Sequence, residues 1–238
     1  MRIYRNHLIE ELAEERLAQL EKLLAKPLSP PIPIDLLAEK VLGLDFLWQP
    51  IDELPGEIIF GGLLARERLI VLNERRAELL RRKPGLERST KGHEMGHWDL
   101  FVDKATLNYP SFSWTGDDPK VVFRSSPAGD VAVLKLLLAD PEGQKLLRRI
   151  QARADKPDEA RAVNRYAAAI SMPSRLLRDE ARAIDRTEWR NLYPLAEKFD
   201  VTITALKVRL EQLDLLRIGR DGKLYDSPDR ARGQSTFF

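Results

Sequence analysis

Hydrophobic residues recur every three to four positions over much of the chain, which is the spacing typical of amphipathic helices. Between residues 8 and 25 this pattern is formed by leucines set among glutamate and arginine residues, namely Leu8, Leu12, Leu17, Leu20 and Leu24. It predicts an N-terminal helix that packs its leucine face on the body of the protein. The same reasoning predicts further helices at 35–42, 75–82, 88–103, 130–139, 141–154 and 157–171, and a pair of helices within 187–214.

Other segments have short apolar runs that are typical of strands. Residues 57–64 and 68–73 lie on either side of a polar centre and predict a strand pair. Residues 215–225 predict a small hairpin that turns at Asp221-Gly222. Residues 104–127 are rich in Pro, Gly, Ser and Asp and predict a long irregular segment. The expected fold class is α+β, with a small sheet packed on helices.

The composition is that of a globular protein with a sizeable core: of 238 residues, 43% are hydrophobic and 32% are charged. The absence of cysteine excludes disulfides and thiolate metal sites and agrees with a reducing cytoplasm. The net charge of +2 excludes a nucleic-acid footprint spread over the whole chain. Neither a secretory signal nor a transmembrane stretch is evident. We therefore expect a cytoplasmic protein that makes no membrane contact.

The clearest chemical feature is the run HEMGH from His93 to His97, which matches the H-E-x-x-H pattern. Four residues turn a helix by about 400°, so the two imidazoles share one face and can reach one ion. Glu94 lies about 100° around the helix, beside the ion rather than on it. There it can take a proton from a water whose pKa zinc lowers to about 7, and pass it to the leaving amine. The pattern predicts a zinc-dependent peptidase, while the third histidine, His7, is expected at the surface.

Catalytic zinc usually has three protein ligands, and without another histidine the third must be a carboxylate. Asp103 stands ten residues after His93, the place of the third ligand in the longer motif H-E-x-x-H-x-x-G-x-x-H. However, Leu100 replaces the glycine at which the chain turns back in that motif. A continuing helix would carry Asp103 out of reach of the metal.

Glu159 is the preferred third ligand. It lies on the helix that Pro157 opens, in the middle of the face expected to be buried, where a metal would compensate a buried carboxylate. Alternatively, Glu159 is simply an acid favoured in the first turn of a helix, and Asp158 is a second choice. Tyr166 could donate to an oxyanion, although a core role is the simpler interpretation. The expected metal ligands are therefore His93, His97 and Glu159. Mn²⁺ or Fe²⁺ would also suit such a site.

With these motifs, the chain resembles the ImmA/IrrE family of metallopeptidases. Family members typically show R-F-T-x-A-H-E-x-G-H, and this chain reads RSTKGHEMGH from Arg88 to His97. A family helix reads roughly E-x-x-x-N-x-F-A-A-x-x-x-M-P, and here NRYAA from Asn164 leads to Met172-Pro173 at the matching distance. The family glutamate falls at Ala160 in this chain, one residue after Glu159.

The resemblance covers about residues 30–215 and implies a zincin-like fold in which the 57–73 strands offer an edge to the substrate backbone. It also implies that the substrate is a partner transcriptional repressor of the helix-turn-helix (HTH) type. Residues 187–214 with the hairpin predict an HTH or winged-helix-like segment, with Lys207 and Arg209 on its second helix. Basic residues there are few, so DNA binding is not favoured. The two helices would otherwise complete the peptidase body.

Two other functions stay open. The first is a non-catalytic regulator that binds a repressor or DNA through the C-terminal segment and has a vestigial metal site. The second is an accessory protein that binds its partner without cutting it. The expected division of the chain is an N-terminal helix (1–30), a zincin-like metallopeptidase domain (31–184), an HTH-like helical subdomain with a short hairpin (185–226) and a flexible tail (227–238).

Overall fold

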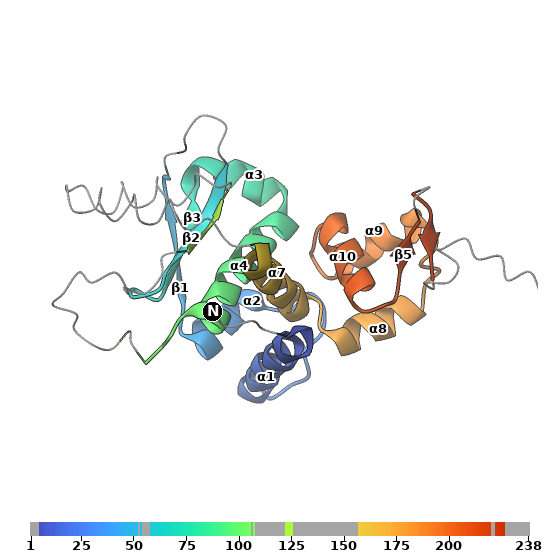
Figure 1. Cartoon of the computed structure of the whole chain (residues 1–238), viewed down its shortest axis with the longest axis horizontal. Helices are drawn as coiled ribbons and strands as arrows, with labels where there is room; N and C mark the ends of the chain where they lie inside the picture. Colours follow the sequence, from blue (N-terminus) through green and yellow to red (C-terminus); the bar gives the residue numbers. More distant parts are fainter. Residues whose placement is uncertain are drawn as a thin grey trace, which may run out of the picture.

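The protein has two lobes, a larger one in which a sheet packs on helices and a smaller C-terminal one (Figure 1). The fold is therefore α+β, as the sequence predicts. The computed structural model describes residues 5–51, 53, 58–105, 107, 122–125, 157–219 and 222–226. The helices predicted at 130–139 and 141–154 and the tail at 227–238 lie outside these residues. No helix in the described part is long and apolar enough to span a bilayer.

The larger lobe contains a four-stranded sheet in the order β1-β3-β2-β4. Its strands are β1 (Asp45–Gln49), β2 (Ile59–Leu64), β3 (Leu69–Asn73) and β4 (Val122–Ser125). β2 pairs antiparallel with both β3 and β4, and β1 pairs parallel with β3. The predicted strand pair is confirmed as β2 and β3. The expectation that this pair offers an open edge is wrong, because β4 pairs with β2 and β1 pairs with β3.

The helices of this lobe are α1 (Asn6–Leu24), α2 (Ile34–Leu36) with the π-helical turn Leu37–Leu42, α3 (Ala77–Arg82), α4 (Pro84–Phe101) and α7 (Pro157–Ser171). α1 packs on α7 as an amphipathic helix. Its buried face is Ile9, Ala13, Leu17 and Leu20, whereas Leu8 is 44% exposed. The buried face of α1 therefore begins at Ile9 instead of Leu8, and Ala13 takes the place that the leucine pattern gave to Leu12.

α4 and α7 approach each other closely because two glycines one turn apart on α4 face α7. A Cβ atom added to Gly96 would lie 3.1 Å from the Cα and carbonyl oxygen of Val163. One added to Gly92 would lie 3.1 Å from the Cβ of Ala167. Both distances are shorter than ordinary van der Waals contacts between carbon atoms. The glycines thus allow α7 to bring its side chains against the helix that carries the HEMGH run.

Replacing Gly96 by alanine is expected to destabilise the protein by about 1–3 kcal/mol, because the added methyl group overpacks against the backbone of Val163. Urea unfolding of the variant and of wild type measures this difference. In an open helix interior the same change would stabilise by about 0.5–1 kcal/mol. A more stable Gly96→Ala protein would therefore contradict the close contact.

The smaller lobe contains α8 (Ser174–Arg182), α9 (Trp189–Lys198), α10 (Ile203–Gln212) and the antiparallel hairpin of β5 (Arg217–Ile218) and β6 (Leu224–Tyr225). The predicted helix pair and hairpin are confirmed. Met172, Leu177, Phe199 and Leu206 belong to a separate apolar core in this lobe. This core includes α8, which the sequence pattern did not predict. The apolar core of this lobe therefore extends back to Met172, and the expected domain division stays a prediction.

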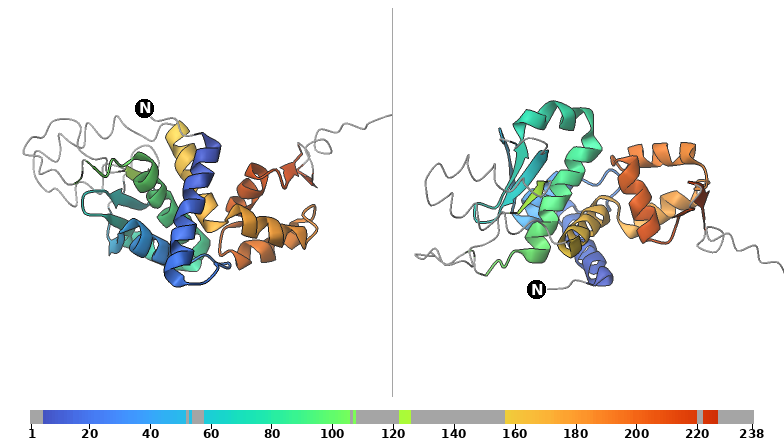
Figure 2. Two further views of the ribbon diagram at one scale, coloured as in Figure 1. Left: turned by 90° about the horizontal axis from the view of Figure 1, so that it is seen from below. Right: turned by 45° about the horizontal axis from the view of Figure 1, so that its top comes forward.

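α1 lies between the two lobes (Figure 2, left) and joins them through a partly buried ion pair. Arg209 on α10 is 0% exposed and donates to both carboxylate oxygens of Glu10 at 2.7 and 2.8 Å. Its Nε donates to the carbonyl of Met172 at 3.0 Å. Arg165 on α7 donates to the same carboxylate at 3.0 Å. Three helices thus meet at Glu10.

The Glu10 cluster predicts a pH-dependent contribution to stability. Burial alone would raise the pKa of Glu10, but the hydrogen bond and charge of Arg209, with those of Arg165, bring it below the ordinary value of 4.5. Such a carboxyl stabilises the fold above its unfolded pKa and loses this contribution as the pH falls through its folded pKa. Glu10→Gln is therefore expected to cost about 1–3 kcal/mol at pH 7, and the cost should shrink in acid.

Urea unfolding at neutral and acidic pH tests this expectation. Glu11→Gln is the matched control, because Glu11 is exposed on the same helix. A cost of Glu10→Gln that stays constant down to low pH would rule out a stabilising charge at this position.

Candidate metal centre

α4 carries the three residues of the predicted catalytic motif and packs between the sheet and α7. It begins with Pro84 in its first turn, a position that proline favours, and ends at Phe101, after which Val102 is extended. The side chains of the motif are buried: His93 is 4% exposed, Glu94 is 0% exposed and His97 is 1% exposed. Polar side chains buried to this extent need hydrogen-bond partners or a metal ion. Here three such side chains lie close together on one helix.

The two histidine rings converge on one point. Their Nε2 atoms are 3.0 Å apart, and the rings are edge-on with centroids 4.7 Å apart. Two nitrogens bound at about 2.0–2.1 Å to one tetrahedral ion are separated by about 3.3 Å. The observed separation differs from this by a few tenths of an ångström. The arrangement that the four-residue spacing predicts for the rings is therefore present, and metal binding itself stays a prediction.

The other nitrogen of His93 contacts a residue of α7. Nδ1 of His93 lies 3.0 Å from Oδ1 of Asn164. When Nδ1–H donates to this oxygen, the lone pair of Nε2 is left facing His97. Histidines that bind metals commonly donate their second N–H to a carbonyl or carboxylate oxygen in this way. The sequence pattern marked Asn164 only as part of the family resemblance. The helix-packing glycines Gly92 and Gly96 are the signal that could have placed it beside His93.

The third metal ligand is not established by the structure. Within the described ranges, no three His, Cys, Asp or Glu side chains lie close enough to share a metal ion. Glu159 is half-buried rather than at the centre of a buried face, because α7 becomes buried only from Ala162 onward. Asp158 is exposed and pairs with Arg161. Glu159 as the third ligand therefore stays a prediction.

Asp103 and His7 are both at the surface. Asp103 is exposed beyond the end of α4, where its carboxylate accepts a hydrogen bond from the amide of Ala105 at 3.1 Å. His7 is exposed near the start of α1, as the sequence predicts. Neither side chain is grouped with the two buried histidines.

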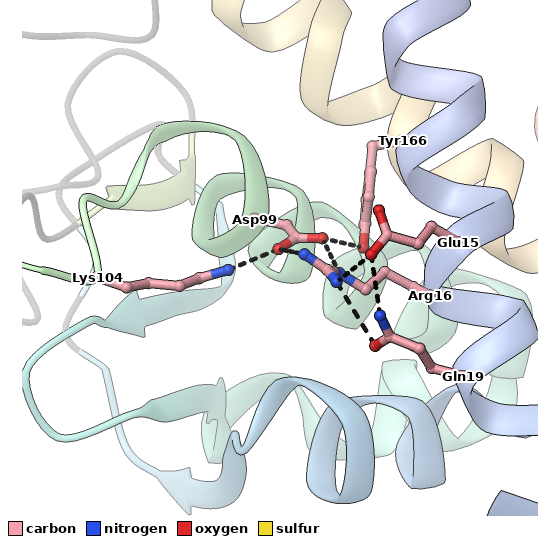
Figure 3. Close-up of polar contacts among 6 residues, drawn as sticks. All are labelled: Glu15, Arg16, Gln19, Asp99, Lys104 and Tyr166. Carbon is pink, nitrogen blue, oxygen red and sulfur yellow. Dashed lines mark hydrogen bonds and ion pairs between the residues drawn. The ribbon is translucent and has the colours of Figure 1, made fainter.

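An ionic cluster around the buried side chain of Asp99 fixes the end of α4 two residues after His97 (Figure 3). The Asp99 side chain is 0% exposed and accepts hydrogen bonds from Arg16 at 2.8 and 3.1 Å and from Lys104 at 2.7 Å. Burial alone would raise the pKa of Asp99, but Arg16 and Lys104 more than offset this effect and hold it below its ordinary value. Asp99 thus joins α4 to α1 and to the chain that follows α4.

Tyr166 belongs to the same cluster. Its hydroxyl donates to Asp99 at 3.0 Å, and the residue is fully buried. Burial and the nearby carboxylate raise the pKa of Tyr166 well above its ordinary value, so the hydroxyl keeps its proton. The core role expected for Tyr166 is confirmed, and its hydroxyl is directed at Asp99.

The first half of α4 is anchored to the segment around α2. Arg88 donates to the carbonyl of Ile32 at 2.7 Å. The ammonium group of Lys91, whose side chain is 10% exposed, contacts Asp35 at 3.0 Å and Glu87 at 2.8 Å. Together with the Asp99 cluster, these contacts fix α4 at both ends of the HEMGH run. The histidines are therefore presented by a well-anchored helix.

The helix pair predicted as HTH-like is docked on the larger lobe. Arg209, expected on its second helix, is buried against Glu10 and does not reach solvent. The turn between α9 and α10 packs on the start of α4, since a Cβ atom on Gly85 would lie 2.6 Å from backbone atoms of Val201 and Thr202. The strongest candidate DNA contact of this segment is thus used inside the protein.

Comparison with known proteins does not assign a family. No protein-family model matches the sequence, and the curated proteins searched contain no match to it.

Proposed function

We propose that this protein is a zinc-dependent peptidase that cleaves a partner transcriptional repressor. The observation that carries the proposal is the convergence of two buried imidazoles, with Nε2 atoms 3.0 Å apart, while Nδ1 of His93 contacts an amide oxygen. Buried histidines need polar partners in any fold. A metal site also requires two ring nitrogens that face one point, which is the arrangement found here. The family resemblance supports the same chemistry.

The residues fit a metal ion in their donor chemistry. His93 and His97 would hold it through Nε2, and both lie on a helix anchored at each end. Glu159 is proposed as the third ligand and stands on the same helix as Asn164, about one and a half turns earlier. A bound zinc ion would acidify a water molecule and polarise a peptide carbonyl. The nitrogen and oxygen donors of this site would also accept Mn²⁺ or Fe²⁺.

Glu94 is proposed as the general base. Its carboxylate follows His93 directly on α4 and is fully buried. A carboxylate oxygen would accept the proton of the attacking water and then deliver it to the nitrogen of the leaving amine. Burial strengthens the interaction between the Glu94 carboxylate and a bound metal ion or water, because charges attract more strongly where bulk water is excluded.

The sheet supplies a place for an extended substrate. β4 is the edge strand next to α4 among the described residues and pairs with β2 on its other side. An extended peptide can add to such an edge through main-chain hydrogen bonds. We propose β4, rather than the β2–β3 pair, as the substrate edge of a zincin-like fold.

The role of a DNA-binding regulator is not favoured. The HTH-like segment would need basic residues on α10 that reach phosphate groups, and Arg209 pairs with Glu10 instead. Lys207 on the same helix is half-buried. We propose that α9 and α10 complete the body of the enzyme.

The direct test is to incubate the zinc-loaded protein with transcriptional repressors of its source organism and to map the products by mass spectrometry. The proposal predicts two fragments from one defined cut, and none when a chelator is present. A repressor that binds the zinc-loaded protein and stays intact would favour the accessory protein that binds without cutting.

A further inference from the structure

We propose that Asn164 is a positioning residue whose amide oxygen holds His93 in the tautomer that can bind a metal through Nε2. The inference deepens the proposed function and rests on it for its metal-binding part. It assigns a role to a residue on α7 that is itself not a ligand. The contact of 3.0 Å between Nδ1 and Oδ1 is its starting point.

The packing of α4 on α7 delivers this contact. Gly96 lies against Val163, the residue before Asn164, and Gly92 lies against Ala167, three residues after it. Asn164 is thus set between two points where the helices are at their closest approach. Because its position is fixed by backbone contacts on either side, its short side chain can reach the ring of His93. Asn164 is an exposed residue and not part of the apolar core, so replacing it should leave the core packing in place.

The tautomer of His93 decides whether Nε2 can bind a metal, because a neutral imidazole carries its single proton on either Nδ1 or Nε2. A proton on Nδ1 leaves the Nε2 lone pair directed toward His97, and a proton on Nε2 occupies the position where a metal would bind. An amide oxygen at Nδ1 can only accept, so it selects the first tautomer. An amide nitrogen at Nδ1 would select the second. The two orientations of the Asn164 amide therefore predict opposite effects on metal binding.

Substitution by aspartate separates the two orientations. Asn164→Asp keeps an acceptor and removes the amide donor, so it should preserve the tautomer of His93 and bind zinc at least as tightly as wild type. Asn164→Leu removes the acceptor at similar size and should weaken zinc binding by about 10–100-fold, the usual effect of losing such a partner. Arg161→Gln is the control on the same helix, because the Arg161 side chain is 77% exposed and pairs with Asp158.

Two readouts are measured on the full chain. Zinc affinity is obtained by competition with a chromogenic chelator, and the His93 tautomer of the metal-free protein is obtained from long-range ¹H–¹⁵N NMR spectra. The proposal predicts Nδ1–H in wild type, Asn164→Asp and Arg161→Gln, and its loss in Asn164→Leu. The tautomer readout does not depend on metal or on activity.

The zinc affinities and the His93 tautomers of these variants decide whether Asn164 positions His93. Unchanged zinc affinity and an unchanged tautomer in Asn164→Leu would overturn it, and so would an Asn164→Asp protein that behaves like the leucine variant. If wild type binds no zinc, the proposed function fails, and the tautomer alone then decides whether Asn164 positions His93. A wild-type His93 that carries its proton on Nε2 would also overturn the proposal.

Discussion

Replacing Glu94 by glutamine is expected to slow repressor cleavage by at least about 10²–10⁴-fold and to leave zinc binding unchanged. Glutamine has nearly the same shape but cannot accept a proton from water. The rate of fragment formation, followed by mass spectrometry, measures the effect, and elemental analysis of the purified variant measures its zinc content.

The matched control for Glu94→Gln is Glu78→Gln, because Glu78 is exposed on the neighbouring helix α3. It should cleave at the wild-type rate. Unchanged cleavage by Glu94→Gln would remove Glu94 from its role as general base. Loss of zinc in that variant would instead make Glu94 a metal ligand. Comparison of unfolding temperatures ensures that both variants are folded in the assay.

Replacing either His93 or His97 by alanine is expected to reduce the zinc content of the purified protein to near zero. Removal of a partner that only supports a ligand already costs about 10–100-fold in affinity, so loss of the ligand itself should exceed that. Zinc at 100 times its Kd should stabilise wild type by about 2.7 kcal/mol. The two variants should show no such stabilisation in thermal unfolding.

His7→Ala is the control for these two substitutions, because His7 is the remaining histidine of the chain and is exposed. It should keep the wild-type zinc content and the wild-type stabilisation. Without metal, His97→Ala should still destabilise the fold, because it removes a buried side chain that contacts the rings of His93 and Phe101. Zinc retained in both His93→Ala and His97→Ala would place any metal elsewhere.

The sequence predicted the helices and strands whose ends are determined by residues within the same segment. Pro157 opens α7, as the sequence indicates. The helix predicted at 35–42 ends before Gly43, which has a φ of +66°. β1 was missed because its sequence, DFLWQ, does not alternate polar and apolar residues, as an edge strand that is partly exposed on both faces need not do. β4 was missed because its pairing partner β2 is distant in the sequence.

The candidate site was predictable to the extent that one helix carries it. The spacing of His93 and His97 places both rings on one face of α4, so that they can meet. Asn164 and Glu159 lie on another helix, α7. The angular position of Glu159 on α7 predicted a buried face, but it could not show that burial begins only at Ala162. The Asp99 cluster depends on Arg16, which lies 83 positions away.

The same limit applies to the C-terminal lobe. Its helix pair and hairpin follow from the sequence pattern, but Arg209 is paired with Glu10 across 199 positions. An arginine on an apparent recognition helix looks available to DNA until its partner is known. Contacts between distant segments therefore changed the interpretation of this lobe more than any local feature.

The most direct test of the central claim is a crystal structure of the zinc-soaked protein with anomalous diffraction recorded at the zinc edge. We expect one strong anomalous peak about 2.0–2.1 Å from Nε2 of both His93 and His97. Anomalous peaks found only elsewhere, or none in a crystal whose two histidine rings still face each other at hydrogen-bond distance, would contradict a metal site at the HEMGH run.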